Sequence, residues 1–595
     1  MYVKRHIVRK GDRDYVYLRL VEAYRNESGQ VRHRLLRTLG REDQLKASGQ
    51  LDQLAASFAR LDPPREGTRR AVGPLLVVAH YLSRLGLAPL VDRLVPVRGR
   101  AQLTHGEVIA ALVANRLCSP SPLYDVAGWA SSAAVHELLG VPGMLLNDDR
   151  LGRALEALAR VAEEVRGELL VGAVRKFPAV VDASRLHLDL TAVRFTGAYE
   201  ESALVAKGWA ADRTVARQIK TLQASTKAGV PLYFRPHQGS ASELPAFMAA
   251  IETLATALPP GLVVVADSGL GYLENLCATD GRNVKFVVPL RADTGWAERF
   301  RADVPAGLPA LELLGHVSYR EQRLPPGERT VWKGLLRPLP VVSADGVLHH
   351  LRVAYIWSSE EADSVREARQ RALDRAEAAL LRIRHGLGGR FYKTRKQVDT
   401  RVAQILSGQA AGLLTVTTGT RAGKPTISWR RDEQAIAAAS ALDGLYALAT
   451  NLPDPRGVPL TALDVLEVYK DQWIVEQRHR DLKQTLRIRP VFLHNDDRIE
   501  ALVAVIGIAL LIFGLIEAQL RTALGDGVPL PGILPEGRAA KPTARAALVA
   551  FDGLSVTYTK GSLVLDRLTQ VQRTILALLD IPLPWPERLG QDLSL

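Results

Sequence analysis

The chain has 595 residues, several times the length of a typical domain, so we expect several domains and more than one hydrophobic core. Its composition, 47% hydrophobic and 24% charged, excludes collagenous, coiled-coil and wholly disordered proteins, and its two cysteines lack the spacing of a disulfide framework or a zinc site. Lys and Arg outnumber Asp and Glu by 77 to 63, and this excess favours a polyanionic partner such as nucleic acid.

The N-terminal part predicts a β unit followed by a helical region. Alternating residues bounded by turn signals indicate strands over Tyr2–Arg9, Tyr15–Arg25 and Val31–Leu39, within a unit that we assign to residues 1–60. This segment lacks the apolar stretch of a secretory signal. Apolar residues at helical spacing then predict a helical, DNA-binding or scaffolding domain over residues 61–177, in which Thr104 and Glu107 have the spacing of a capping box.

The remainder of the chain predicts a mixed α/β fold. Apolar strand-like runs alternate with helical stretches over residues 178–291, and this texture returns over residues 441–524. Between them, residues 292–440 form a β-rich insertion with a charged helix over Ser359–His385, and a Pro/Gly-rich stretch separates a C-terminal tail, residues 525–595. The apolar run Ala501–Ile516 is short for a membrane span, so we interpret it as a buried core helix and expect no membrane association.

Asp189 lies in a strand-like segment in which leucines alternate with polar residues. Leu186, Leu188 and Leu190 fall on one face of the predicted strand, and His187, Asp189 and Thr191 fall on the other. The pattern therefore presents a carboxylate at a fixed position. A solvent-facing aspartate on an ordinary strand is the alternative, and Asp182 is a rival for the same role.

Asp267 directly follows Leu262–Ala266, an apolar run typical of a strand that is buried on both faces in a parallel sheet. Ligands of open α/β sheets gather at the carboxyl ends of the strands, where this aspartate is expected. A helix-capping role for Asp267 is the alternative.

A helix is predicted over YKDQWIVEQRHRDLKQTLRIRPVF, in which Tyr469, Glu476 and Lys483 recur every seven residues. Seven residues turn an α-helix through almost two full turns, so these three side chains are expected on one stripe, with Val468, Val475 and Leu482 on the neighbouring stripe. A solvated amphipathic helix is the alternative.

Two aspartates and a glutamate are the hard oxygen ligands that metal-dependent phosphoryl transfer requires. We therefore predict that Asp189, Asp267 and Glu476 are catalytic and that they bind two Mg²⁺ or Mn²⁺ ions. Lys483 is placed to meet a DNA phosphate, and Arg478 and Arg480 make its surroundings basic.

With these residues in view, the chain resembles bacterial insertion-sequence transposases of the DDE class, in the superfamily named after insertion sequence four. Tyr469, Glu476 and Lys483 match its Tyr-x2-Arg-x3-Glu-x6-Lys signature, with Gln472 in place of the usual arginine. Asp189-Leu190-Thr191 and Ala266-Asp267 match its first and second motifs. The resemblance implies an α/β, RNase H-like mixed-sheet core, interrupted by the β-rich insertion and preceded by the β unit and the helical domain.

The resemblance also implies the reaction and its partners. The expected activity is cleavage at transposon ends and transfer of the 3′-hydroxyl strand into target DNA, by a homodimer on paired terminal inverted repeats in the bacterial cytoplasm. We expect DNA contacts from these residues of the signature and from the basic segment Arg382–Lys396: Tyr469, Gln472, Arg478, Arg480, Lys483, Arg390 and Lys393.

Two other functions remain open at this point. Gln472 is consistent with a transposase-derived protein that binds DNA without cutting it, and the same carboxylates suit an RNase H-like structure-specific nuclease. An ATPase is rejected, because Gly419–Lys424 is one residue short of a phosphate-binding loop and is followed by Pro425.

Overall fold

A computed structural model describes residues 2–10, 13–25, 31–48, 67–97, 101–209, 214–318, 321–407, 410–471, 473–486, 493–525 and 527–587. The chain forms two compact units. The first comprises residues 1–182, 191–241 and 477–595, and the second comprises residues 183–190 and 242–476. Strand β5 (Arg185–Arg194) and helix α17 (Trp473–Arg480) each contain residues of both units.

The N-terminal residues form the antiparallel sheet β1-β2-β3 that the sequence predicts. Its strands are β1 (Tyr2–Lys10), β2 (Arg13–Arg25) and β3 (Val31–Arg41), followed by helix α1 (Glu42–Ala47). Leu18 and Val21 of β2 and Leu45 of α1 are buried, so α1 covers one face of this small sheet.

The helical region that the sequence predicts is also present. Its helices are α3 (Leu75–Leu85), α4 (Leu87–Leu94), α5 (His105–Cys118), α6 (Val126–Ser132), α7 (Val135–Leu139), α8 (Asp148–Ala159) and α9 (Ala162–Lys176), with 3₁₀ turns at Leu123–Asp125 and Gly143–Leu145. Thr104 and Glu107 form both hydrogen bonds of the predicted capping box at the start of α5.

The centre of the first unit is the long helix α18 (Asp496–Leu524), which contacts α3, α5, α8 and α9 and strand β8 (Pro231–Gln238). By length and composition α18 could cross a membrane, but 94% of its most apolar stretch is buried within the protein, as expected for a core helix. The bent pair of α3 and α4 meets the same criteria only if it is taken as one span. A Cβ on Gly507 or Gly514 would lie 2.6 Å from Phe234 or Pro231, so these glycines let β8 lie directly on the helix.

The predicted C-terminal tail is folded. It contains helix α19 (Ala544–Val549), strands β17 (Ser555–Thr559) and β18 (Ser562–Leu565) and helix α20 (Gln570–Leu578). Strand β17 pairs with both β18 and β4 (Arg69–Ala71), which forms the sheet β18-β17-β4. The end of the chain therefore completes a sheet of the first unit, and helices α19 and α20 contact α18.

The second unit is built on a large mixed sheet. Its strand order is β11-β12-β13-β16-β10-β9-β5, in which β9 is parallel to both β5 and β10 and the other pairs are antiparallel. The strands are β9 (Val263–Val265), β10 (Lys285–Pro289), β11 (Glu312–Leu314), β12 (Trp332–Val342), β13 (Leu348–Ser358) and β16 (Leu445–Thr450). The helices beside them are α10 (Glu243–Ala257), α11 (Leu273–Gly281), α12 (Trp296–Asp303) and α16 (Ala462–Lys470), with 3₁₀ turns at Ser268–Leu270 (η3), Ala292–Thr294, Leu308–Ala310, Pro326–Glu328 and Pro455–Gly457.

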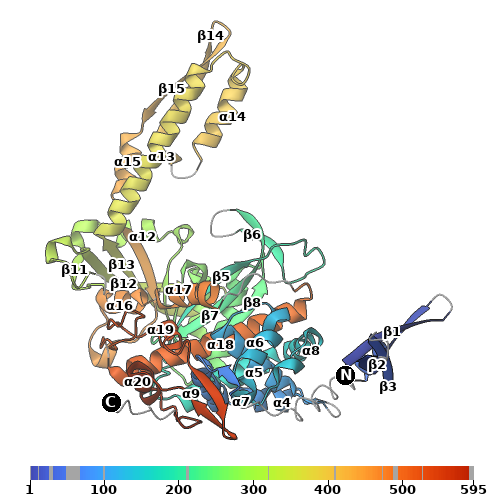
Figure 1. Cartoon of the computed structure of the whole chain (residues 1–595). Coiled ribbons are helices and arrows are strands. Elements are labelled where there is room, and N and C mark those ends of the chain that lie inside the picture. The colour runs from blue at the N-terminus through green and yellow to red at the C-terminus, as the bar shows by residue number, and fades with distance from the viewer. Residues whose placement is uncertain are drawn as a thin grey trace. The chain divides into compact units, whose positions relative to one another are not determined.

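The predicted insertion divides into two parts. Strands β11 to β13 join the large sheet, whereas the rest forms an arm that leads away from it (Figure 1). The arm consists of α13 (Ser359–His385), α14 (Arg395–Ile405), the hairpin β14 (Leu414–Arg421) and β15 (Lys424–Arg431), and α15 (Glu433–Ser440). It has its own apolar core, which includes Leu380, Ile383 and Val398. Trp332 is buried in the sheet's core, and Trp357 donates its Nε1–H to the Asp443 carbonyl at 2.8 Å.

The second half of β5 belongs to the first unit, where it lies beside β7 (Val215–Thr226). The Phe195 amide donates to the Arg217 carbonyl at 2.8 Å, and the Thr221 hydroxyl donates to the Thr191 carbonyl at 3.3 Å. Strand β7 pairs antiparallel with β6 (Ala206–Trp209) and with β8. The predicted mixed α/β fold is therefore confirmed.

Candidate active site

Asp189 lies near the middle of β5, at the point where the burial of the strand changes. Leu186, His187 and Leu188 are all fully buried, whereas Asp189 and Leu190 are partly exposed. The expected half-buried strand is therefore wrong for the first half of β5, because consecutive residues, which point to opposite faces of the strand, are all buried there. Asp189 is the first residue of β5 after this buried stretch, which makes its carboxylate accessible.

Asp267 follows β9 and caps the 3₁₀ turn η3. Its Oδ1 accepts the Gly269 amide at 2.9 Å, and the preceding Ala266 is fully buried. The capping role that the sequence left open is thus real, but it occupies one lone-pair direction of one oxygen and leaves the other oxygen available.

The two aspartates occupy equivalent places on neighbouring parallel strands. His187 of β5 pairs with Val265 of β9, and each aspartate lies two residues further along its own chain. Side chains two residues apart on a strand share a face, and neighbouring strands lie about 4.8 Å apart. The register therefore brings Asp189 and Asp267 side by side at the carboxyl end of β9.

The electrostatics of Asp267 are consistent with this arrangement. Burial is the largest cause that raises the pKa of Asp267, which reaches about 6, and the nearby carboxylates of Asp189 and Glu243 raise it further. The Gly269 amide and the Arg291 guanidinium act in the opposite direction. Negative charge is thus concentrated around Asp267.

The segment that carries Tyr469 and Glu476 differs from the prediction. One continuous helix was expected, but α16 ends at Lys470, Asp471 forms a turn, α17 spans Trp473–Arg480, and a π-helical turn, η9, spans Asp481–Thr485. The seven-residue stripe is therefore wrong as a geometric argument, because it assumes an unbroken α-helix. The apolar side is correct at two positions, since Val475 and Leu482 are fully buried.

The Tyr469 side chain nevertheless lies within electrostatic reach of all three predicted carboxylates. Burial is the largest cause that raises the pKa of its hydroxyl, which reaches about 12, and the charges of Asp267, Glu476 and Asp189 contribute to the rise. The Tyr469 ring packs against the hydrophobic cluster that includes Leu448 and Val465, and the Arg185 guanidinium lies 3.3 Å from the Asp471 carboxylate. The end of α16 is thereby held next to the start of β5, with the exposed Glu476 side chain following on α17.

The donor set suits a hard divalent cation. Among the residues that the structure describes, no three His, Cys, Asp or Glu side chains are close enough together to enclose a metal ion. Mg²⁺ rarely occupies such an all-protein cage, since it commonly binds through one or two carboxylates with water and substrate phosphates as its other ligands. The adjacent carboxylates of Asp189 and Asp267 match that requirement.

Lys483 lies in the π-helical turn, where its Nζ donates to Thr191 Oγ1 at 2.6 Å. Thr191 is the third residue of the Asp189-Leu190-Thr191 motif, so two elements of the predicted signature meet in the first unit. Lys483 is partly exposed and Arg480 is exposed, so the Lys483 ammonium and the Arg480 guanidinium are accessible to a phosphate.

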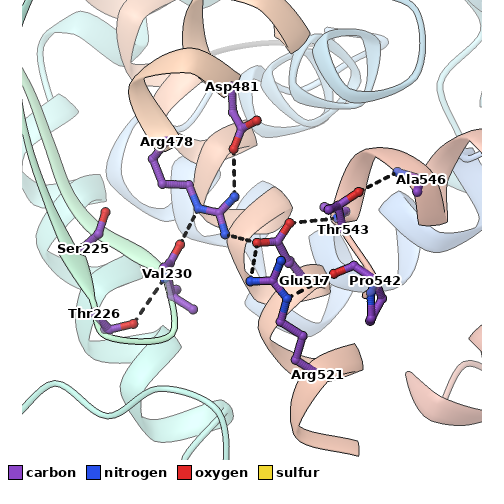
Figure 2. Close-up of polar contacts among 12 residues, drawn as sticks. Ser225, Thr226, Val230, Arg478, Asp481, Glu517, Arg521, Pro542, Thr543 and Ala546 are labelled. Atoms are coloured by element: carbon purple, nitrogen blue, oxygen red, sulfur yellow. Dashed lines mark hydrogen bonds and ion pairs between the residues drawn. The ribbon is translucent and has the colours of Figure 1, made fainter. Parts of the chain in front are cut away.

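Arg478 is not accessible, which corrects its prediction as a DNA contact. Its side chain is 2% exposed and pairs with Glu517 at 2.6 Å and Asp481 at 2.8 Å, while its Nε donates to the Gly229 carbonyl at 2.6 Å. Glu517, 1% exposed, also accepts from Arg521 at 2.9 Å and from the Ala544 amide at 3.1 Å (Figure 2). The guanidinium is neutralised in the core and anchors this end of α17, so Arg478 is not a DNA contact.

The remaining predicted positions lie in different places. Arg390 and Lys393 are exposed in the α13–α14 connection of the arm, next to Phe391, which is also exposed. Gln472 lies outside the residues that the structure describes. Asp182, the rival first ligand, is exposed and lies three residues before Arg185, where the pairing of β5 with β9 begins. Two further charged residues near Asp267 were not predicted: Glu243 is the first residue of α10, and Arg291 follows the end of β10 by two residues.

Comparison with protein families identifies the class of protein that this site belongs to. Residues 182–512, more than half of the chain, match the family described as "Transposase DDE domain", so the chain belongs to the DDE transposases. Residues 3–66 match "IS1634 family transposase, N-terminal domain", which makes the chain similar to the IS1634 family within that class. Residues 69–165 match a family described as a domain of unknown function (DUF4277). No curated protein matches the chain.

Membership of this class settles the broad function. A transposase binds DNA inside the cell, cleaves it and transfers a strand, and DDE transposases generally use divalent metal ions. The prediction of a DNA transposase is therefore confirmed, and the family matches support a DDE transposase similar to the IS1634 family.

Proposed function

We propose that Asp189, Asp267 and Glu476 are the catalytic carboxylates and that they hold two Mg²⁺ or Mn²⁺ ions beside the scissile DNA strand. The observation that carries this proposal is the register of β5 and β9, which aligns the two aspartates. The position of Tyr469, within electrostatic reach of Asp189, Asp267 and Glu476, supports the third member.

The reaction is two phosphoryl transfers. In the first, a water oxygen attacks the phosphorus at the transposon end, the bond from phosphorus to the 3′-oxygen breaks, and a 3′-hydroxyl is released. In the second, that hydroxyl attacks a target phosphorus in line, a new phosphodiester bond forms, and the target strand leaves with its own 3′-hydroxyl. When bound, the metal ions lower the pKa of the attacking hydroxyl and stabilise the departing oxygen.

The residues of the chain contribute position and charge. Asp267 is oriented by the Gly269 amide, and Asp189 is oriented by the rigid, fully buried first half of β5. Lys483, held by the Thr191 hydroxyl, is placed to bind a phosphate of the DNA, and the exposed Arg480 adds charge to the same helical segment. Arg390 and Lys393 of the arm are proposed as contacts to flanking DNA.

We also propose the finer classification and assembly that the motifs support. Tyr469, Glu476 and Lys483 have the spacing of the superfamily named after insertion sequence four. A homodimer on paired terminal inverted repeats follows from the same likeness, and the domain divisions inferred from the sequence remain predictions.

The test uses the full chain with a DNA duplex that carries the element's own terminal repeats. Mg²⁺- or Mn²⁺-dependent nicking that is lost in Asp267→Ala, followed by joining of the released end to a second duplex, is the expected result. Binding without cleavage would favour a non-catalytic DNA-binding protein, and nicking without joining would favour a structure-specific nuclease.

A further inference from the structure

Glu243, the first residue of α10, is a further carboxylate in the second unit next to Asp267. Helix α10 is held in place by Phe247, Ile251 and Leu254, which are all fully buried, and it contacts the 3₁₀ turn η3 that Asp267 caps. The helix therefore fixes where the Glu243 side chain begins.

The environment of Gly269 shows how close the two carboxylates are. A Cβ at this glycine would lie 2.9 Å from Asp267 Oδ1 and 2.9 Å from Glu243 Oε2. Both oxygens are thus within 2.9 Å of one point and at most twice that distance apart. Phe247 Cε2 lies 3.2 Å from the same point, so residues 243 and 247, one helical turn apart, both face the catalytic turn.

The helix macrodipole explains only part of this arrangement. An acidic residue in the first turn of a helix is stabilised by the partial positive charge there. The helix macrodipole does not require the Glu243 carboxylate to point at another carboxylate. The Coulomb repulsion between Glu243 and Asp267 opposes their close approach. A cation bound between them would remove this repulsion.

We propose that Glu243 is a fourth carboxylate of the metal site and binds a divalent cation together with Asp267, directly or through a metal-bound water. This inference rests on the proposed function, because it assumes that Asp267 is a metal ligand. It assigns Gly269 a role as well, since any side chain there would occupy the space between the two oxygens.

The test measures binding of Mn²⁺ alone to the full-length protein, by the loss of the electron paramagnetic resonance signal of free Mn²⁺. We expect Glu243→Gln to weaken the tighter Mn²⁺ site by about tenfold or more. Glu252→Gln is the matched control, because Glu252 lies on the same helix, is exposed, and receives the same substitution. Its Mn²⁺ affinity is expected to equal that of the wild type.

Two further variants make the outcome decisive. Gly269→Ala retains every carboxylate but places a methyl group between them, and it is expected to weaken Mn²⁺ binding as well. Thermal unfolding checks that each variant is folded. If Asp267→Asn abolishes Mn²⁺ binding while Glu243→Gln and Gly269→Ala stay within twofold of the wild type, the role of Glu243 is overturned and the proposed function stands. If Asp267→Asn itself leaves Mn²⁺ binding unchanged, the proposed metal ligands fail.

Discussion

Two buried or partly buried carboxylates of this protein have opposite surroundings. Glu517, in the first unit, accepts hydrogen bonds or ion pairs from Arg478, Arg521 and the Ala544 amide. Asp267, in the second unit, has a pKa raised first by burial and then by the neighbouring carboxylates of Asp189 and Glu243. The difference separates a carboxylate that is paired with cationic groups of the folded chain from one that lies among other carboxylates, where we propose that a cation binds.

The largest expected effect is on catalysis at Asp267. Asp267→Asn removes a proposed metal ligand with almost no change in shape, so we expect cleavage of a terminal-repeat duplex to fall on the order of a thousandfold. Glu517→Asp, which keeps the charge at the other site, serves as the comparison, and cleavage by its folded fraction should stay within about tenfold of the wild type. Equal losses in the two variants would contradict the functional division.

The next effect concerns the stability of the first unit. Arg478→Met leaves Glu517 and Asp481 without their shared guanidinium, and we expect the free energy of unfolding to fall by about 3–5 kcal/mol. Urea unfolding, followed by the far-ultraviolet circular dichroism signal, measures this change. Arg480→Met, two residues away and exposed, is the control, and it should change stability by less than about 0.5 kcal/mol.

A double substitution refines this result. Arg478→Met combined with Glu517→Gln removes both the cation and the uncompensated carboxylate, so we expect it to be more stable than Arg478→Met alone by about 1–3 kcal/mol. The same urea experiment gives the coupling energy. If the two substitutions lower the free energy of unfolding additively, Glu517 is held by Arg521 and Ala544 without help from Arg478.

The smallest effect is the dependence of stability on pH in the absence of metal. The folded-state pKa of Asp267 is about 6, above its ordinary value of 3.8, so its contribution is fully favourable below pH 3.8 and is lost as the pH rises through 6. Asp267→Asn should therefore raise the melting temperature relative to the wild type at pH 8 by roughly 1–3 °C, and much less at pH 5. Scanning calorimetry in a chelator measures the difference, and a larger gain at pH 5 would contradict the sign.

The sequence predicted the elements that depend on local pattern. The strands before Asp189 and Asp267 follow from alternation and from an uninterrupted apolar run, and Ala501–Ile516 was correctly interpreted as a buried helix. The place of Asp267 at the carboxyl end of β9 followed from the rule that ligands of open α/β sheets gather there, whereas the register that aligns it with Asp189 had no local signal.

The sequence could not show features that depend on distant partners. The break after Lys470 and the π-helical turn were hidden because each residue there has an ordinary helical propensity. Arg478 is a basic residue among other basic residues, and only its contact with Glu517, 39 residues later in the chain, distinguishes it. The turn of the β17–β18 hairpin has a local signal at Lys560 and Gly561, which both adopt positive φ. The pairing of β17 with Arg69–Ala71 has no local signal.

That last pairing has a consequence for biosynthesis. Domains generally fold as they emerge from the ribosome, with N-terminal segments first. The second unit is fully translated once residue 476 has been added, whereas the sheet β18-β17-β4 cannot form until the ribosome has passed residue 565. A nascent chain therefore has its three proposed catalytic carboxylates long before the first unit is complete, and a message truncated before β17 would leave β4 without its partner strand.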